Sequence, residues 1–172
     1  MRKFYAALMV LGLLAGTAVI YAVRNWDPYR NIPQVSLNRL NQSEANWYAQ
    51  GILDYDARIS VAFSSELRQY EVVVRSGVFS EARSSRWEEA LEAWGPFSPT
   101  PAEEAGFITM PGIFSTVRSA LFNESVPREV LRMEIDAALA FPKRVILGRI
   151  FEDGLPVDGT EVLIEVVEFE IR

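Results

Sequence analysis

The sequence contains no cysteine and no histidine among its 172 residues. These absences exclude thiol and imidazole nucleophiles, and zinc or haem sites with the usual ligands. They also exclude disulfides, so the hydrophobic core alone must stabilise the fold. Any catalysis would depend on carboxylates, arginine, Lys143, serine or tyrosine, and no convergent set of these is visible. We therefore expect a non-enzymatic protein that needs no metal or cofactor.

Charge is absent from residues 4–23, a run of 20 residues that is almost wholly apolar. As a helix this run would be about 30 Å long, the thickness of the hydrocarbon core of a bilayer. It predicts a transmembrane signal-anchor at residues 1–23, which contacts membrane lipid through residues 4–23. Residues 24–35 contain Pro28 and Pro33 and read as a juxtamembrane linker, and residues 36–172 form one domain.

Two features of the anchor leave alternatives open. Gly16 and Ala18 would also suit a signal-peptide cleavage site after residue 18, although the apolar run continues to Val23. Arg2 and Lys3 favour a cytoplasmic N-terminus, which places the domain outside the cytoplasm, in the periplasm or at the cell surface.

Gly12 and Gly16 are four residues apart and would lie on one face of the anchor helix. Glycines at this spacing let a second transmembrane helix approach closely, so they predict contact with another membrane subunit or a homodimer. The alternative interpretation is ordinary membrane-span composition.

The remaining residues are acidic. Without Arg2 and Lys3, the 17 basic residues fall to 15 against 23 acidic ones, a net charge of −8. Such a domain repels nucleic acid and anionic lipid surfaces, so we expect no nucleic-acid partner.

Apolar periodicity predicts an α+β fold: a twisted antiparallel sheet of about six strands with two or three helices on one face. Ser36 and Gly51 bound one predicted helix, Thr109 begins another, and Ser85 with Glu88 suggests a capping box for a third. Alternation predicts the strands, with a β-bulge near Val166–Val167, where the apolar phase slips by one residue. The strands are predicted at 54–63, 69–75, 78–83, 131–137, 144–151 and 160–172.

Several short motifs follow one another in a fixed order: Trp47, Gly51-Ile52, Asp54-Tyr55, Val74 to Gly77, Thr109 to Phe114, and Asp136 with Leu139, Phe141 and Pro142. Together they resemble a family of small exported or membrane-anchored bacterial domains, domain of unknown function 6174, over about residues 36–150. Ala140 and Phe141 stand where that family has Gly-Tyr, and the cysteines of many members are absent. The resemblance implies structural roles for the motif residues and carries no activity.

Acidic clusters offer weaker candidate sites. Asp54 and Asp56 share a strand face and could bind Ca²⁺ or act as an acid–base pair, or simply form a solvated face. Asp136 suggests a structural hydrogen bond, an ion pair with Lys143 or Arg144, or a binding role. A second acidic group surrounds predicted turns, where turn chemistry competes with Ca²⁺ binding: Glu152, Asp153, Asp158 and Glu161.

Four aromatic residues flank the segment 96–106, and they are either core cover or an exposed patch that docks a partner: Trp87, Trp94, Phe97 and Phe107. These features favour a non-enzymatic, membrane-anchored extracytoplasmic interaction module, an accessory or structural subunit of a membrane complex. The alternatives are an exported domain that binds a small ligand or peptide, and a carboxylate-based hydrolase.

Overall fold

The structure is a computed structural model of the chain, and it describes residues 29–63, 66–123, 126, 131–148, 151–152, 155–156 and 161–172. The chain divides into two units, Met1–Asn31 and Ile32–Arg172, and the second contains every element described below. The predicted span at residues 4–23 lies outside the described residues. Within those residues, no helix is both long enough and apolar enough to cross a bilayer.

The described chain contains three α-helices: α2 (Leu37–Ala49), α3 (Ala102–Ala105) and α4 (Met110–Phe122). The Ser36 hydroxyl caps α2 by accepting a hydrogen bond from the Arg39 N–H, and Gly51 follows this helix with a φ of 65°. The Thr109 hydroxyl caps α4 by accepting from the Gly112 N–H at 3.1 Å. The predicted cap of α2 and the predicted start of α4 near Thr109 are therefore confirmed.

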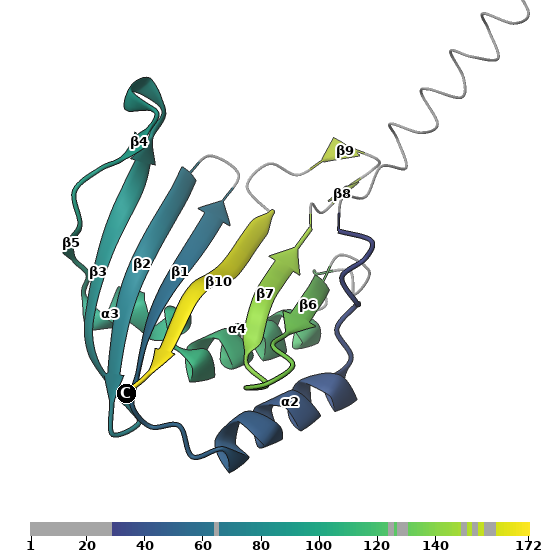
Figure 1. Cartoon of the computed structure of the whole chain (residues 1–172). Coiled ribbons are helices and arrows are strands. Elements are labelled where there is room, and N and C mark those ends of the chain that lie inside the picture. The colour runs from purple at the N-terminus through teal and green to yellow at the C-terminus, as the bar shows by residue number, and fades with distance from the viewer. Residues whose placement is uncertain are drawn as a thin grey trace, which may run out of the picture. The chain divides into compact units, whose positions relative to one another are not determined.

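Eight strands form one antiparallel sheet: β1 (Tyr55–Phe63), β2 (Glu66–Arg75), β3 (Val78–Glu88), β4 (Ala93–Trp94), β5 (Ser98–Pro99), β6 (Leu131–Ile135), β7 (Pro142–Leu147) and β10 (Val162–Ile171). Their order is β4-β3-β2-β1-β10-β7-β6, and β5 pairs with β3 (Figure 1). β8 (Phe151–Glu152) and β9 (Leu155–Pro156) form a separate hairpin. All six predicted strands are present, and the two additional strands of the large sheet, β4 and β5, have two residues each, too few to show alternation.

The predicted helix after Ser85 is wrong. Residues 85–88 continue β3, which a 3₁₀ turn, η1 (Glu89–Leu91), connects to β4. Trp87 pairs across this hairpin with Trp94, so their spacing of seven reflects a hairpin register rather than two turns of helix. The Ser85 hydroxyl donates to the Gly95 carbonyl at 2.6 Å instead of capping a helix.

The predicted bulge in the last strand is confirmed. Arg58 pairs with Glu168 and Ile59 pairs with Val166, which leaves Val167 without a cross-strand partner on β1. Ile164 and Val166 are buried before the bulge, and Phe169 packs on the core after it. The extra residue therefore keeps both halves of β10 facing the same core.

A single core lies between the sheet and its helices. α2 contributes Leu40 and Trp47, and α4 contributes Ile113, Phe114 and Val117, all with at most 3 % exposure. They pack on inward side chains of the central strands, and both helices lie on the same side of the sheet (Figure 1). The other face of β1, β2 and β3 carries ion pairs, such as those of Arg58 and Arg83 with Glu71.

Candidate functional site

Residues from most of the separate motifs line one pocket of about 280 Å³, which we call the Trp47 pocket. Its wall comes from the end of α2, the start of β1, the β2–β3 turn and the segment before α4. No lining residue carries a charge: Trp47, Tyr48, Gly51, Ile52, Leu53, Tyr55, Val74, Gly77, Phe79, Gly106, Thr109 and Pro111. The arrangement suits an uncharged, largely apolar group.

Glycines shape three sides of the Trp47 pocket. Gly51 and Gly77 have φ values of 65° and 75°, and the Gly77 N–H donates to the Leu53 carbonyl at 2.8 Å. These conformations suit glycine because other residues adopt them only with strain. Gly106 is different, because its φ is −59° and a Cβ built on it meets no atom within 4 Å.

Tyr55, a residue of this apolar wall, carries a buried hydroxyl. The side chain is 2 % exposed, and its oxygen accepts a hydrogen bond from the Met110 N–H at 3.0 Å. No residue in the described ranges accepts the hydrogen of this hydroxyl. Burial raises the pKa of Tyr55 to about 12, against the lowering effect of the Met110 hydrogen bond, so the group stays a neutral donor near pH 7.

Two aromatic rings of the pocket wall, those of Trp47 and Tyr55, pack with two rings outside the lining, those of Phe141 and Phe169. Trp47 packs edge-on against Tyr55, Phe141 and Phe169 with centroid distances of 5.8–6.2 Å. Phe141 stacks on Phe169 at 4.7 Å. Because the four rings come from α2, β1, the turn before β7, and β10, they fix Tyr55 relative to distant parts of the chain.

Asp136 has a structural role in the turn that carries Phe141. Its carboxylate accepts hydrogen bonds from the Ala138 and Leu139 N–H groups at 3.0 and 2.8 Å. Ala140 adopts a left-handed φ of 57°, and its carbonyl accepts a hydrogen bond from the Ser43 hydroxyl of α2 at 2.6 Å. Pro142 then begins β7. The turn therefore connects β6, β7 and α2.

The two aspartates suggested as an acid–base pair are each engaged elsewhere. The Asp54 carboxylate accepts from the Ser76 N–H at 2.7 Å and fixes the β2–β3 turn. Asp56 forms ion pairs with Arg75 and Arg172 at 2.7 and 2.8 Å. Burial tends to raise the pKa of Asp56, but the hydrogen bonds from Arg172 and Arg75 outweigh it and lower the pKa below its usual value.

The four aromatic residues of the suggested docking patch do not share one environment. Trp87 and Trp94 pack edge-on at 5.5 Å on the β3–β4 hairpin. Phe97 lies under the Arg83 guanidinium, 5.8 Å from its ring centre. Phe107 packs against Tyr70 at the border of the core.

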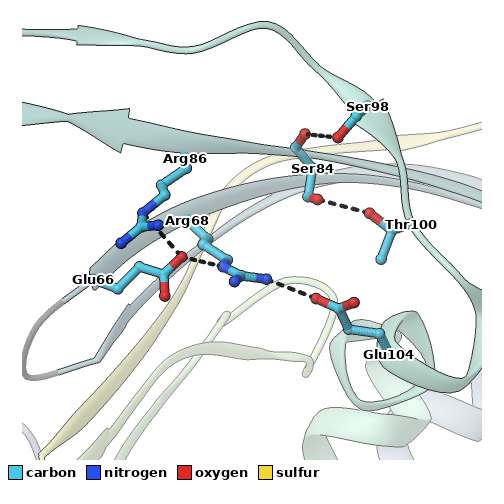
Figure 2. Close-up of polar contacts among 7 residues, drawn as sticks. All are labelled: Glu66, Arg68, Ser84, Arg86, Ser98, Thr100 and Glu104. Carbon is cyan, nitrogen blue, oxygen red and sulfur yellow. Dashed lines mark hydrogen bonds and ion pairs between the residues drawn. The ribbon is translucent and has the colours of Figure 1, made fainter. Parts of the chain in front are cut away.

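A polar cluster that the sequence did not reveal lies where β2 and β3 meet α3 (Figure 2). Arg68 and Arg86 are cross-strand partners, and both contact the Glu66 carboxylate between them. Arg68 also binds Glu104 of α3 at 2.8 Å, and the Thr100 hydroxyl donates to Ser84 Oγ at 2.8 Å. Glu66 thus offsets two like charges that face each other, and the cluster ties α3 to the sheet.

Several remaining site predictions lie outside the described residues: Gly12, Gly16, Asp153, Asp158 and the side chain of Glu152. The described part of the chain contains no group of three or more acidic side chains placed to hold a metal ion.

The pocket residues that the sequence missed, Gly106 and Phe79 among them, have no motif of their own. Only their position beside Thr109 and Gly77 in the chain could have indicated them.

No family model matches the chain, and neither does any curated protein. The resemblance described from the motifs therefore stays a prediction.

Proposed function

We propose that the chain is a non-enzymatic, membrane-anchored extracytoplasmic module that binds an apolar group in the Trp47 pocket. One observation carries this proposal: residues from separate segments converge on a pocket without a charged lining side chain. Two exposed side chains at the pocket, Tyr48 and Leu53, are 57 % and 55 % exposed and extend its apolar surface to solvent. Large apolar side chains left in water beside a pocket are typical of binding surfaces.

The test uses a variant that fills the pocket. Gly106→Leu adds a side chain where a Cβ meets open space and the backbone is unstrained. The tagged full chain and this variant would be purified in mild detergent, and co-purifying proteins and small molecules identified. We expect a molecule that the wild type retains and the variant loses.

Ser119→Leu is the matched control, because Ser119 is exposed on α4 and lies outside the pocket lining. Equal retention by the wild type and both variants would contradict binding in the Trp47 pocket.

A second candidate function is an accessory subunit of a membrane complex that contacts its partner through other surfaces. The β3–β4 hairpin favours it, because Leu91 is 68 % exposed beside the partly exposed Trp94. Replacing Leu91 and Trp94 with serine should then release a protein partner, whereas Gly106→Leu should not.

A further inference from the structure

We propose that the ligand of the Trp47 pocket is a small neutral molecule with an apolar body and one carbonyl oxygen, which accepts a hydrogen bond from the Tyr55 hydroxyl. This inference rests on the proposed function, because it assumes that the pocket binds a ligand. It adds the chemical class of that ligand and the residue that selects it.

The apolar body follows from the pocket wall. Trp47, Ile52, Leu53, Val74, Phe79 and Pro111 surround it, and no lining side chain could neutralise a charged group. A charged ligand would lose its hydration without gaining an ion pair in return, which is strongly unfavourable. A neutral ligand has no such cost, and the volume of about 280 Å³ suits a molecule of one or two rings.

The carbonyl follows from the hydrogen bonds of Tyr55. A phenol has one hydrogen to donate, and a buried hydroxyl without an acceptor is unfavourable. The Tyr55 oxygen already accepts from the Met110 N–H, which lies between two pocket residues, Thr109 and Pro111. No described residue takes the hydroxyl hydrogen, so an acceptor on the ligand would complete the hydrogen bonding of this group.

Thr109 carries the other buried hydroxyl of the wall, and this group is already satisfied. Thr109 Oγ1 donates to the Gly106 carbonyl at 3.0 Å and accepts from the Gly112 N–H at 3.1 Å. Of these two buried hydroxyls, Tyr55 therefore has the hydrogen to donate, and we assign the selection of an acceptor to it. Because the phenol is neutral around pH 7, we expect this selectivity to be unchanged between pH 6 and pH 9.

Benzophenone is a suitable probe, because it combines two rings with one carbonyl and forms covalent adducts under ultraviolet light. The full chain in nanodiscs of zwitterionic phospholipid would be irradiated with it, and the adducts located by mass spectrometry. We expect adducts within residues 47–55 and 106–111. Gly106→Leu should reduce labelling of these segments at least tenfold, and Ser119→Leu should leave it unchanged.

Tyr55→Phe keeps the ring and removes the hydroxyl. The benzophenone concentration for half-maximal labelling should rise several-fold to about tenfold, as for the loss of one hydrogen bond. Diphenylmethane has a methylene group in place of the carbonyl. Diphenylmethane should compete with benzophenone and reduce labelling. The concentration needed should be the same for the wild type and Tyr55→Phe, because diphenylmethane offers no hydrogen-bond acceptor.

The outcomes separate the two proposals. If Gly106→Leu does not reduce the labelling of the pocket segments, the proposed function is overturned. Labelling that Gly106→Leu abolishes but Tyr55→Phe leaves unchanged would overturn the role of the carbonyl alone. A further comparison uses the wild type alone and does not depend on the stability of the variant. If diphenylmethane reduces labelling at the concentration at which benzophenone gives half-maximal labelling, the carbonyl contributes nothing to binding and its role is overturned.

Discussion

Phe141 packs with the aromatic rings of Trp47 and Phe169, and it is only 5 % exposed. Phe141→Ala removes a ring that contacts both Phe169 and Trp47. We expect the free energy of unfolding to fall by about 3–5 kcal/mol, as for other buried aromatic truncations. Urea unfolding of the full chain in detergent, followed by tryptophan fluorescence, measures this loss.

Asp54→Ala provides the comparison for this prediction. The aspartate makes one hydrogen bond at an exposed turn, with Ser76, so its removal should cost about 1 kcal/mol. Equal losses in the two variants would show that the aromatic rings contribute less than their burial indicates.

Asp56 should make stability depend on pH in the acid range. Its folded-state pKa is depressed, because hydrogen bonds from Arg172 and Arg75 outweigh burial. A carboxylate of this kind contributes stability above its unfolded pKa, about 3.9, and loses it as pH falls through the folded pKa. The free energy of unfolding should therefore decline below about pH 4, and less steeply in Asp56→Asn.

Acid titration of both proteins by circular dichroism tests this expectation. Glu66, whose pKa is lowered chiefly by the hydrogen bond from Arg68, should retain part of the slope in the variant. Identical curves for Asp56→Asn and the wild type would show that the ion pairs at Asp56 do not persist in solution.

At the scale of elements, the bulge in β10 leads us to predict that the fold tolerates the deletion of one residue. Deleting Val167 leaves Val166 opposite Ile59 and Glu168 opposite Arg58, so every remaining side chain keeps its face. We expect the deletion variant to retain one cooperative thermal transition. Differential scanning calorimetry measures it.

Deleting Glu71 is the control. This residue lies in the regular pairing of β2 with β1, and its loss would turn Val72 and Val74 away from the core or create a new bulge. That variant should lose its cooperative transition. If both deletions abolish the transition, the bulge has a role beyond the phase of β10.

Sequence patterns predicted the long elements well, because the apolar periodicity within each element indicates which of its faces is buried. Alternation along Tyr55–Phe63 and the N-caps Ser36 and Thr109 are local signals that the structure retains. The β3–β4 hairpin was mispredicted because Ser85 and Glu88 also match a capping box. Only the pairing of Trp87 with Trp94, a tertiary contact, distinguishes the two. The position of Gly106 at the Trp47 pocket likewise depends on tertiary contacts.

At the scale of the whole molecule, the proposed membrane anchor at residues 4–23 leads us to expect a contact within the membrane. Gly12→Ile with Gly16→Ile should still insert, because isoleucine is more apolar than glycine, and stay with membranes after a carbonate wash. It should lose association with its partner or second copy, because interhelical contacts worth about 1–2 kcal/mol depend on close approach. Chemical cross-linking in native membranes measures this association.

Replacing Leu11 and Leu14 with isoleucine is the matched control, since neither belongs to the glycine pair. Association that survives in the glycine variant would mean that Gly12 and Gly16 are ordinary membrane-span composition. A soluble product that begins at Val19 would instead identify a cleaved signal peptide.

The central position of β10 has a consequence for the timing of folding. β10 is the last strand in the described part of the chain, yet it lies between β1 and β7, and its partners on β1 stand 99 to 116 positions earlier in the chain. Until it emerges, the sheet exists only as two separate halves with unpaired inner edges. Such long-range closure is slow. The domain would therefore complete its sheet only after β10 has left the ribosome, and until then the edges of β1 and β7 that β10 covers remain open to pairing with other chains.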